Sequence, residues 1–250
     1  MPRRLWTRDE TLVAFNIYCR TPFGKLHKSN PDILAVAAVL GRSANSVAMK
    51  CCNLAACDAA QQARGISGLS GASSMDRQIW REFELDPERV AFDAELAYAS
   101  LLSQPPRQAA EVEWEDVAGL DIEVTAKVRV NQSFFRSLIL AGYRAECAVC
   151  ELPFPPLLVA SHIVPWAEDK RLRMDPRNGI CLCALHDKAF DRGLLLIGGD
   201  YKISLADELA AAKRLPSVAA NFGRFAGESL RLPDRWWPAP ELLQKRINAI

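Results

Sequence analysis

The chain has 250 residues, half of them hydrophobic, and is therefore long enough to bury a substantial core in one or two domains. Its formal net charge is only +1, which excludes the strongly basic composition that marks many nucleic-acid-binding proteins. No basic start precedes a long apolar run, and no apolar stretch reaches about 18 residues, so neither a signal peptide nor a membrane span is predicted. We therefore expect a cytoplasmic protein whose cysteines serve a metal or the core rather than disulfides.

The charges are unevenly distributed and predict three regions. Residues 1–70 carry nine Lys/Arg against four Asp/Glu, residues 71–126 carry four against thirteen, and residues 127–250 carry eighteen against thirteen. The acidic middle is interpreted as a helical linker region with a solvated surface. The glycine- and serine-rich stretch at residues 64–74 (RGISGLSGASS) is typical of a domain boundary and separates the first region from the second.

Cap residues predict three helices in the first region. Thr7 and Glu10 form a capping box, and Asn30 precedes a proline suited to the first turn of a helix. Ser43 caps the third helix, SANSVAMKCCNLAA. Only a short turn that begins at Gly41 separates the second helix from the third, which favours a helix-turn-helix arrangement.

The third helix is predicted to present a polar face outward. The outward positions are Asn45, Met49, Lys50 and Asn53. On this interpretation Asn45 reads bases in a major groove, while Arg42 and Lys50 contact phosphates. The alternative is a three-helix bundle that makes no DNA contact, because such turns are common in small helical domains.

Most of the candidate chemistry lies between Tyr143 and Gly193, a stretch that holds four of the eight cysteines and two of the three histidines. Cys147 and Cys150 form one pair at metal-ligand spacing, and Cys181 and Cys183 form a second pair about thirty residues later. Alternate residues on a strand share a face, so both members of the second pair are candidate zinc ligands. Alternatively, Cys183 and His186 complete the ligand set and Cys181 packs into the core.

Between the cysteine pairs, the sequence predicts a strand, a charged loop, a second strand and a helix. The first strand carries His162 and ends at Pro165, because proline lacks the amide that a strand ladder needs. Asn178 follows the loop, and the residues from Ala184 to Asp191 form the expected helix.

This order resembles the HNH endonucleases, whose fold is a ββα-metal finger. The resemblance lies in SHIVPW, DPRNGICL and ALHDKAFDRGLL, and it is closest to the bacterial restriction-endonuclease-like branch. The segments LWTRDE, TPFGKLH and LGRSANSVAMKCCNL also resemble an amino-terminal region often joined to that branch. The expected fold class is therefore α+β, with a helical, helix-turn-helix-like domain at residues 1–70, the acidic helical linker region at 71–126 and an HNH nuclease domain at 127–250.

The resemblance also implies roles for single residues. His162 matches the general base that activates water, and Asn178 matches the residue that orients the loop or touches the metal. Asp187 falls where many relatives carry a metal-binding histidine, while His186 is the nearest histidine and fits either that role or the zinc set. The implied cofactors are Mg²⁺ or Mn²⁺ for catalysis and a structural Zn²⁺, because phosphodiester hydrolysis needs both a base and a cation.

Two functions follow from this resemblance, beside a third, a nuclease effector that acts on RNA or on DNA without sequence preference. The first is a metal-dependent endonuclease that cleaves double-stranded DNA, belongs to a restriction or defence system and acts as a homodimer or by sequential nicking. The second is a zinc-stabilised DNA-binding regulator without cleavage activity. Cleavage that is lost in His162→Ala distinguishes the first from the second.

Overall fold

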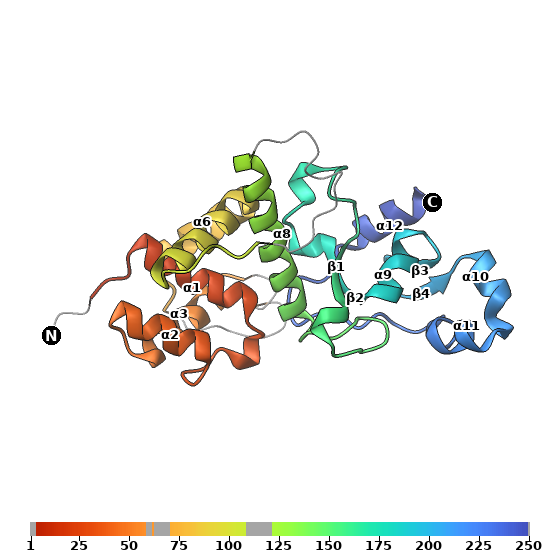
Figure 1. Ribbon diagram of the computed structural model, residues 1–250, viewed down its shortest axis with the longest axis horizontal. Helices are drawn as coiled ribbons and strands as arrows, with labels where there is room; N and C mark the ends of the chain where they lie inside the picture. Colours follow the sequence, from red (N-terminus) through yellow and green to blue (C-terminus); the bar gives the residue numbers. More distant parts are fainter. Residues whose placement is uncertain (1–3, 59–61, 63–70, 109–121, 250) are drawn as a thin grey trace. The chain divides into compact units, whose positions relative to one another are not determined.

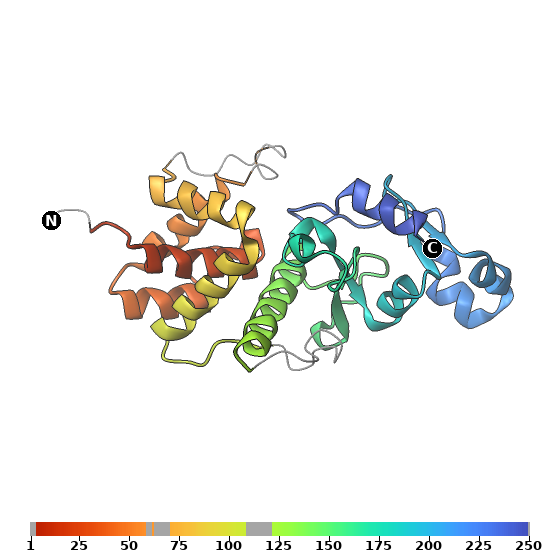
Figure 2. The ribbon, with the colours of Figure 1, turned by 90° about the horizontal axis from the view of Figure 1, so that it is seen from above.

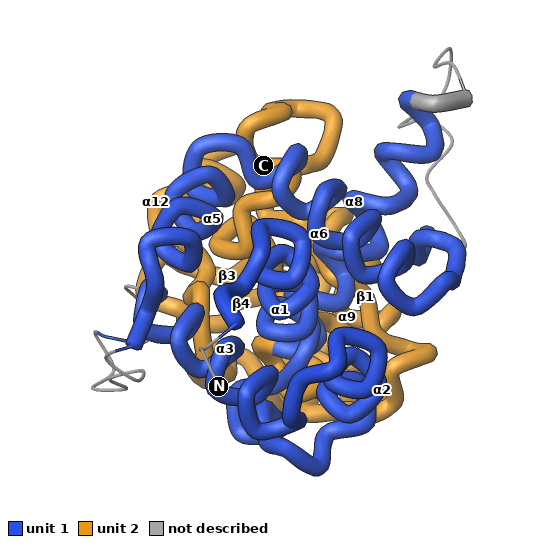
Figure 3. Tube along the Cα trace, turned by 90° about the vertical axis from the view of Figure 1, so that its left-hand side faces the viewer, with its two compact units in different colours: residues 1–141 blue, residues 142–250 orange. Residues whose placement is uncertain are grey.

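The computed structural model describes residues 4–58, 62, 71–108 and 122–249, and the side chains of residues 122 and 123 are not described. Its helices and small antiparallel sheets confirm the predicted α+β class (Figure 1). The chain divides into two compact units, Met1–Ala141 and Gly142–Ile250 (Figure 3). The division at residues 70 and 126 that the charges predict remains a prediction, and most of the stretches 64–74 and 111–123 lies outside the described residues.

Helices dominate the first unit. Over the described residues they are α1 (Arg8–Arg20), the 3₁₀ turn η1 (Phe23–Lys25), α2 (Pro31–Leu40), α3 (Ala44–Ala55), α5 (Ser74–Leu85), α6 (Pro87–Leu101) and α8 (Ile122–Gly142), whose last residue belongs to the second unit. At 21 residues, α8 is the longest helix of the described part and is seen side-on in Figure 2.

The predicted caps begin three of these helices. Thr7 accepts a hydrogen bond from the backbone amide of Glu10, whose carboxylate reaches back to the Thr7 amide. Asn30 and Ser43 cap α2 and α3 through their side-chain oxygens. The sequence signals of these helix starts are therefore confirmed, because each cap satisfies amides that have no partner inside the helix.

The core of the first unit forms where α1 packs against α3, α5 and α6. Phe15 on α1 is fully buried and makes edge-to-face contacts with Trp80 and Phe83 of α5, at centroid distances of 6.0 and 5.1 Å. Tyr18, one turn further along α1, also meets the Trp80 ring. Burial of these large rings stabilises this unit.

Gly41 ends α2 with a left-handed backbone, φ +60°, a conformation that glycine adopts without steric cost. The chain bends by 112° between α2 and α3. Across the described ranges, no single helix has the length and apolar character to cross a membrane; α2 and α3 meet that test only when taken together as a bent pair.

The predicted outward orientation of Lys50 is wrong. Its side chain is buried and forms an ion pair with Asp76, which is also fully buried at the start of α5. Lys50 also lies 3.4 Å from the Ser73 hydroxyl. Val47, Lys50, Cys51 and Leu54 share the inward stripe of α3, so helical spacing rather than charge decides where Lys50 points.

The second unit is built on a small antiparallel sheet. Strand β1 (Leu158–His162) pairs with β2 (Gly179–Cys183), with His162 opposite Gly179 and Leu158 opposite Cys183. Helix α9 (Ala184–Asp191) follows β2 without a break and packs on both strands. The predicted strand, loop, strand and helix are therefore present in that order.

A second hairpin and several short helices follow. They are β3 (Leu195–Ile197), β4 (Ile203–Leu205), α10 (Asp207–Ala211), η5 (Ala212–Arg214), α11 (Pro216–Asn221), η6 (Gly223–Phe225) and α12 (Pro240–Asn248). The 3₁₀ turn η2 (Pro155–Leu157) precedes β1. Two more, η3 (Lys170–Leu172) and η4 (Pro176–Asn178), lie in the loop between β1 and β2. We refer to residues 207–226 as the α10–α11 lobe.

The segment between the α10–α11 lobe and α12 runs back along the ββα unit formed by β1, β2 and α9, which we call the finger. The Leu230 amide donates to the Tyr201 carbonyl, and the Arg231 amide donates to the Ala148 carbonyl. Further along, the Ala239 amide donates to the carbonyl of Arg177. These backbone bonds join the C-terminal segment to the β3–β4 turn, to the turn that holds Cys147 and Cys150, and to the loop between β1 and β2.

Candidate metal centre and active site

Four side chains of the second unit converge on one point. They are Cys147, Cys150, Cys183 and His186, whose ligand atoms all lie within 4.8 Å of one another. The sulfur atoms of Cys150 and Cys183 are 3.9 Å apart, and His186 Nδ1 lies 3.5 Å from the Cys147 sulfur. A tetrahedral Zn²⁺ with ordinary bond lengths requires S···S edges of about 3.8 Å and S···N edges of about 3.5 Å. The spacing therefore fits a four-coordinate zinc site.

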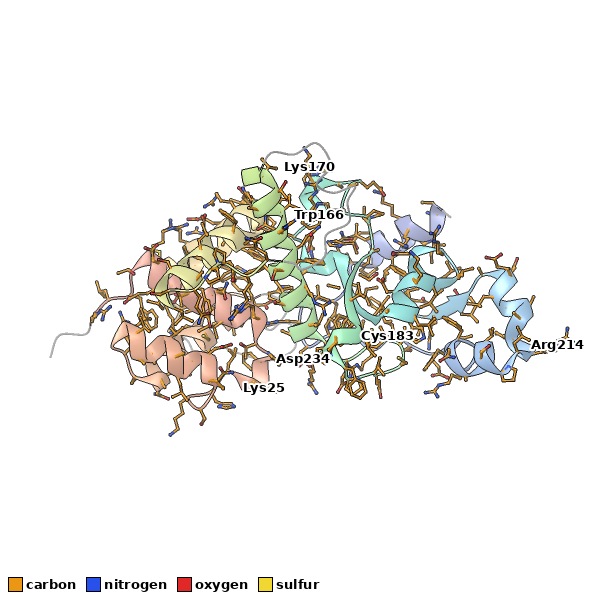
Figure 4. The ribbon with its side chains drawn as sticks, viewed as in Figure 1. Lys25, Trp166, Lys170, Cys183, Arg214 and Asp234 are labelled. Carbon is orange, nitrogen blue, oxygen red and sulfur yellow. The ribbon has the colours of Figure 1, made fainter. Side chains whose placement is uncertain are left out.

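Local structure places each ligand. Cys147 and Cys150 sit in a tight turn in which the Glu151 amide donates to the Cys147 carbonyl and Glu151 adopts φ +59°. Cys183 is the last residue of β2 and directly precedes α9 (Figure 4), and His186 stands on the first turn of that helix. A hydrogen-bonding interaction with Cys183 lowers the pKa of the Cys147 thiol, although burial opposes the shift. The thiolate that a metal requires is thus favoured at this position.

The second ring nitrogen of His186 is also engaged. Nε2 lies 2.8 Å from the backbone carbonyl oxygen of Asn221, at the end of α11. A carbonyl only accepts, so Nε2 carries the proton and Nδ1 presents its lone pair to the three thiols. Phe222 and Phe225 contact the imidazole edge-to-face, at 5.6 and 5.5 Å. Metal-bound histidines commonly have such a carbonyl partner, which fixes the ring and its tautomer.

Cys181 lies outside this group, although its thiol is buried. Its backbone carbonyl accepts a 2.7 Å hydrogen bond from the amide of Ala148, which lies in the turn that holds Cys147 and Cys150. Of the two ligand sets that the sequence left open, the geometry matches the one that joins Cys183 and His186. Both cysteines lie on β2, yet Cys181 stays outside the group of four, so the two-residue alternation alone does not decide the ligand set.

His162 stands at the end of β1, next to the charged loop. Its Nε2 atom lies 3.0 Å from the Arg173 carbonyl, which makes Nε2 the donor and leaves the basic lone pair on Nδ1. The Arg173 side chain donates to the Trp166 carbonyl at 2.9 Å and stacks on the Trp166 ring, which in turn contacts the His162 ring at 5.5 Å. Burial lowers the pKa of His162 to about 4. The imidazole is therefore neutral, and able to accept a proton, at neutral pH.

Asn178 is fully buried and holds the two ends of the loop together. Its Oδ1 accepts from the Val164 amide at 2.8 Å, and its Nδ2 donates to the carbonyls of Val164 and Leu172 at 3.0 and 3.1 Å. Three backbone groups that would otherwise be buried without partners are satisfied by this one amide. These bonds are those of a residue that orients the loop.

Asp187 follows His186 on α9 and is partly exposed. Its carboxylate interacts electrostatically with Arg246. Within the described residues, the group around Cys147 is the one set of three or more His, Cys, Asp or Glu side chains close enough to hold a metal. Asp187 is therefore a carboxylate on the helix of the finger and belongs to no such set among the described residues.

The three predicted DNA contacts lie in the first unit and differ in exposure. Asn45 is exposed on α3. Arg42 is occupied within the chain, donating to the Leu5 carbonyl at 2.7 Å and to the Glu10 carboxylate at 2.8 Å. Lys50 is held by Asp76, as described above. In this conformation, neither cation presents its charge to solvent.

Sequence reasoning missed three contributors to these sites. The carbonyls of Asn221 and Arg173 orient the two histidines, and Arg246 bonds to backbone on both sides of the finger. Every residue has a backbone carbonyl, so no sequence signal could have identified the carbonyls of Asn221 and Arg173 as partners of the histidines. Arg246 lies at helical spacing from an apolar residue in the last helix, which is a sequence signal for a position near the core. Its bonding partners could not be inferred from the sequence.

The arrangement defines a ββα unit with a candidate metal centre at one end and a partly buried histidine at the end of its first strand. Residues 147–198 match the model of a family described as HNH endonuclease, so the chain carries an HNH endonuclease domain in its second unit. This confirms the resemblance seen in the sequence. Neither curated proteins nor solved structures gave a match to the chain.

Proposed function

We propose that the protein is a metal-dependent endonuclease that hydrolyses phosphodiester bonds in double-stranded DNA. The observation that carries the proposal is His162, held by the Arg173 carbonyl in the tautomer whose Nδ1 is basic, within a domain of the HNH endonuclease family. A neutral imidazole at this position removes a proton from the attacking water. Burial keeps the ring unprotonated at neutral pH, while the lowered pKa also makes it a weaker base.

A divalent cation such as Mg²⁺ or Mn²⁺ supplies charge neutralisation at the scissile phosphate and the leaving oxygen. Asp187 is the residue proposed to hold it, because hard cations prefer carboxylate oxygens and often bind through one or two carboxylates plus substrate phosphate. Asn178 is assigned the loop-orienting role, since its amide already bonds to Val164 and Leu172.

The structural ion proposed is Zn²⁺, bound by Cys147, Cys150, Cys183 and His186. This assignment takes His186 for the zinc set and leaves His162 as the proposed base. The closed set of three sulfurs and one nitrogen is typical of a structural site, because catalytic zinc sites keep a position open. The Asn221 carbonyl behind His186 supports the same assignment.

The helical unit is proposed to contact DNA through a helix-turn-helix formed by α2 and α3. The 112° bend between them falls within the range of about 90–120° seen in such motifs, and Gly41 lies in the turn. Asn45 is the exposed polar residue best placed for base contact. Arg42 and Lys50 would bind phosphates only after leaving Glu10 and Asp76.

A restriction or defence role, with a homodimer that cuts both strands, completes the proposal; it rests on the family alone. One finger cuts one strand, so paired fingers or two successive nicks are needed for a double-strand break.

The test is incubation of the purified protein with plasmid, unmodified and cytosine-methylated, in Mg²⁺, Mn²⁺ or EDTA. We expect metal-dependent cleavage that falls by about 10²–10⁴-fold in His162→Ala, the usual range for loss of a general base. Zinc content and DNA retention in a gel shift are expected to be unchanged in that variant, which shows that the fold survives. Intact plasmid in every metal, with a retained gel shift, would instead support the second candidate, a zinc-stabilised DNA-binding regulator, which the aspartate at position 187 favours.

A further inference from the structure

One side chain of the last helix bonds to both halves of the ββα unit. Arg246 Nη1 donates to the Ile163 carbonyl at 2.8 Å, and Nη2 donates to the Phe190 carbonyl at 2.8 Å. Arg246 lies on α12, outside the residues that match the HNH family. A residue from beyond the finger therefore spans it.

Both acceptors adjoin residues proposed to act in cleavage. Ile163 directly follows His162 at the end of β1, and its own amide bonds to the Asn178 carbonyl at 2.9 Å. Phe190 lies three residues after Asp187, so the two share one face of α9. A single guanidinium group thus bridges the end of β1 and this part of α9.

The environment of Arg246 holds that group in one orientation. Its guanidinium carbon lies 4.0 Å from the centre of the Phe190 ring, and the side chain is only 12% exposed. The Asp191 carboxylate approaches to 3.7 Å. A planar fork with two donors in fixed relation can bridge two carbonyls, whereas the single ammonium of lysine cannot keep both bonds in the same geometry.

We infer that Arg246 is a positioning residue for cleavage, which fixes the end of β1, and with it His162, against the face of α9 that carries Asp187. This inference rests on the proposed nuclease function. The two hydrogen bonds of Arg246 act through the backbone of Ile163 and Phe190. Its contribution is to the geometry of the reacting groups rather than to their chemistry.

A purely structural brace would show different behaviour. Such a brace would lower stability, while the folded fraction would cleave DNA at the normal rate. A positioning residue changes the rate of the chemical step in protein that is fully folded, because displacement of about 1 Å between reacting groups costs on the order of 100-fold in rate.

The experiment compares wild type, Arg246→Lys and Arg246→Met with a matched control, Arg231→Met. Arg231 lies in the same C-terminal segment and is likewise partly buried. It forms an ion pair with Glu146 and donates to the Tyr143 carbonyl at 2.8 Å, so its side chain contacts the segment before Cys147 rather than the strand that carries His162. Single-turnover cleavage is measured well below the unfolding temperature of each variant, together with KM, zinc content and thermal stability.

We expect the single-turnover rate to fall by about 10- to 100-fold in Arg246→Lys and Arg246→Met, with zinc content and KM within about twofold of wild type. Arg231→Met is expected to lose stability but to keep the wild-type rate. An unchanged rate in folded Arg246→Lys overturns the inference. So does an equal loss of rate in Arg231→Met.

A measurement independent of cleavage separates this inference from the proposed function. The chain has three histidines, so ¹⁵N-histidine spectra are simple, and His162→Ala assigns the His162 signals. We expect Arg246→Lys to shift the His162 Nε2 and Nδ1 resonances while His27 and His186 stay unchanged. If wild type cuts no DNA, the nuclease proposal fails, and unchanged His162 signals in Arg246→Lys would then overturn the positioning role as well.

Discussion

His186 Nε2 lies 2.8 Å from the carbonyl oxygen of Asn221, a residue 35 positions later in the chain. This bond, with the Phe222 and Phe225 rings against the imidazole, ties the candidate zinc site to the α10–α11 lobe. None of the described residues of this lobe is itself buried, so it has no hydrophobic core of its own. Its order depends on what it attaches to.

We therefore predict that removal of zinc loosens the α10–α11 lobe before the rest of the protein. Cys150→Ser is expected to lose the ion, and trypsin is expected to cleave more readily after Lys213, Arg214 and Arg224, because the His186 ring is no longer fixed against Asn221. The measurements are zinc content by atomic absorption and the sites of limited tryptic cleavage by mass spectrometry.

Cys181→Ala is the matched control, since this thiol is buried two residues from Cys183 but outside the ligand group. It should keep one zinc per chain and the wild-type pattern of cleavage, with a modest loss of stability from the cavity. Zinc loss in Cys181→Ala together with full zinc in Cys150→Ser would show that the ligand set is assigned incorrectly.

The sequence predicted the local elements well because their signals are local. Thr7 with Glu10, Asn30 and Ser43 each mark a helix start within three residues of the cap, and all three starts are confirmed. The order of strand, loop, strand and helix followed in the same way from apolar runs and one proline.

Long-range partners could not be predicted by the same means. Lys50 was placed outward because it is charged, but Asp76, 26 residues later, neutralises it in the core. The two-residue alternation of a strand makes Cys181 a ligand candidate, yet His186 on the following helix takes the fourth position. In both cases the decisive partner is chosen by tertiary packing, which the spacing within one element does not contain.

The second prediction concerns pH. Burial lowers the pKa of His162 to about 4, well below its ordinary value of 6.5, so the ring stays neutral in the folded protein through most of the mildly acidic range. The acid limb of single-turnover cleavage should therefore fall near pH 4–5 rather than near 6.5, since a base must be unprotonated to act.

The same pKa makes a prediction for stability. The unfolded chain binds a proton at His162 below its ordinary pKa of 6.5, whereas the folded chain does not until about pH 4. Stability contributed at this position is thus complete above pH 6.5 and is lost as the pH falls from there toward about 4. Urea unfolding of wild type and His162→Gln across this range measures it; parallel curves for the two proteins would contradict the assignment.

The third prediction tests Asn178 as the residue that holds the loop. Asn178→Asp keeps the shape of the side chain but removes the two hydrogen bonds donated to the Val164 and Leu172 carbonyls and buries a charge. We expect a loss of about 2–4 kcal/mol in the free energy of unfolding at neutral pH. The loss relative to wild type at the same pH should shrink in acid, where the new carboxyl group is protonated and can donate one bond again.

Asn178→Asp also separates loop geometry from metal binding. If Asn178 served mainly as a ligand for the catalytic cation, an aspartate would bind that ion at least as well, and cleavage would be kept or improved. Unchanged stability with increased cleavage in Mg²⁺ would therefore assign Asn178 to the metal instead of the loop.

The fourth prediction concerns the helical unit. Lys50→Met leaves the Asp76 carboxylate buried without its counter-charge, and we expect a loss of about 3–5 kcal/mol in unfolding free energy. The double variant Lys50→Met/Asp76→Asn should recover part of this, because the amide still accepts the 2.7 Å hydrogen bond from the Ser73 amide without carrying a charge. Denaturant unfolding of the four proteins of this cycle gives the coupling energy directly.

The cycle also decides how Lys50 relates to DNA. If Lys50 contacts a phosphate, its variant should have normal stability, and the slope of log K for DNA binding against log salt concentration should fall by about one unit. A lysine that pairs with Asp76 gives the opposite result, an unstable single variant and a rescued double variant that binds DNA with the wild-type salt dependence. Because Lys50 and Asp76 are both buried in the structure, we expect the second result, and the salt slope of the double variant is the measurement that would contradict it.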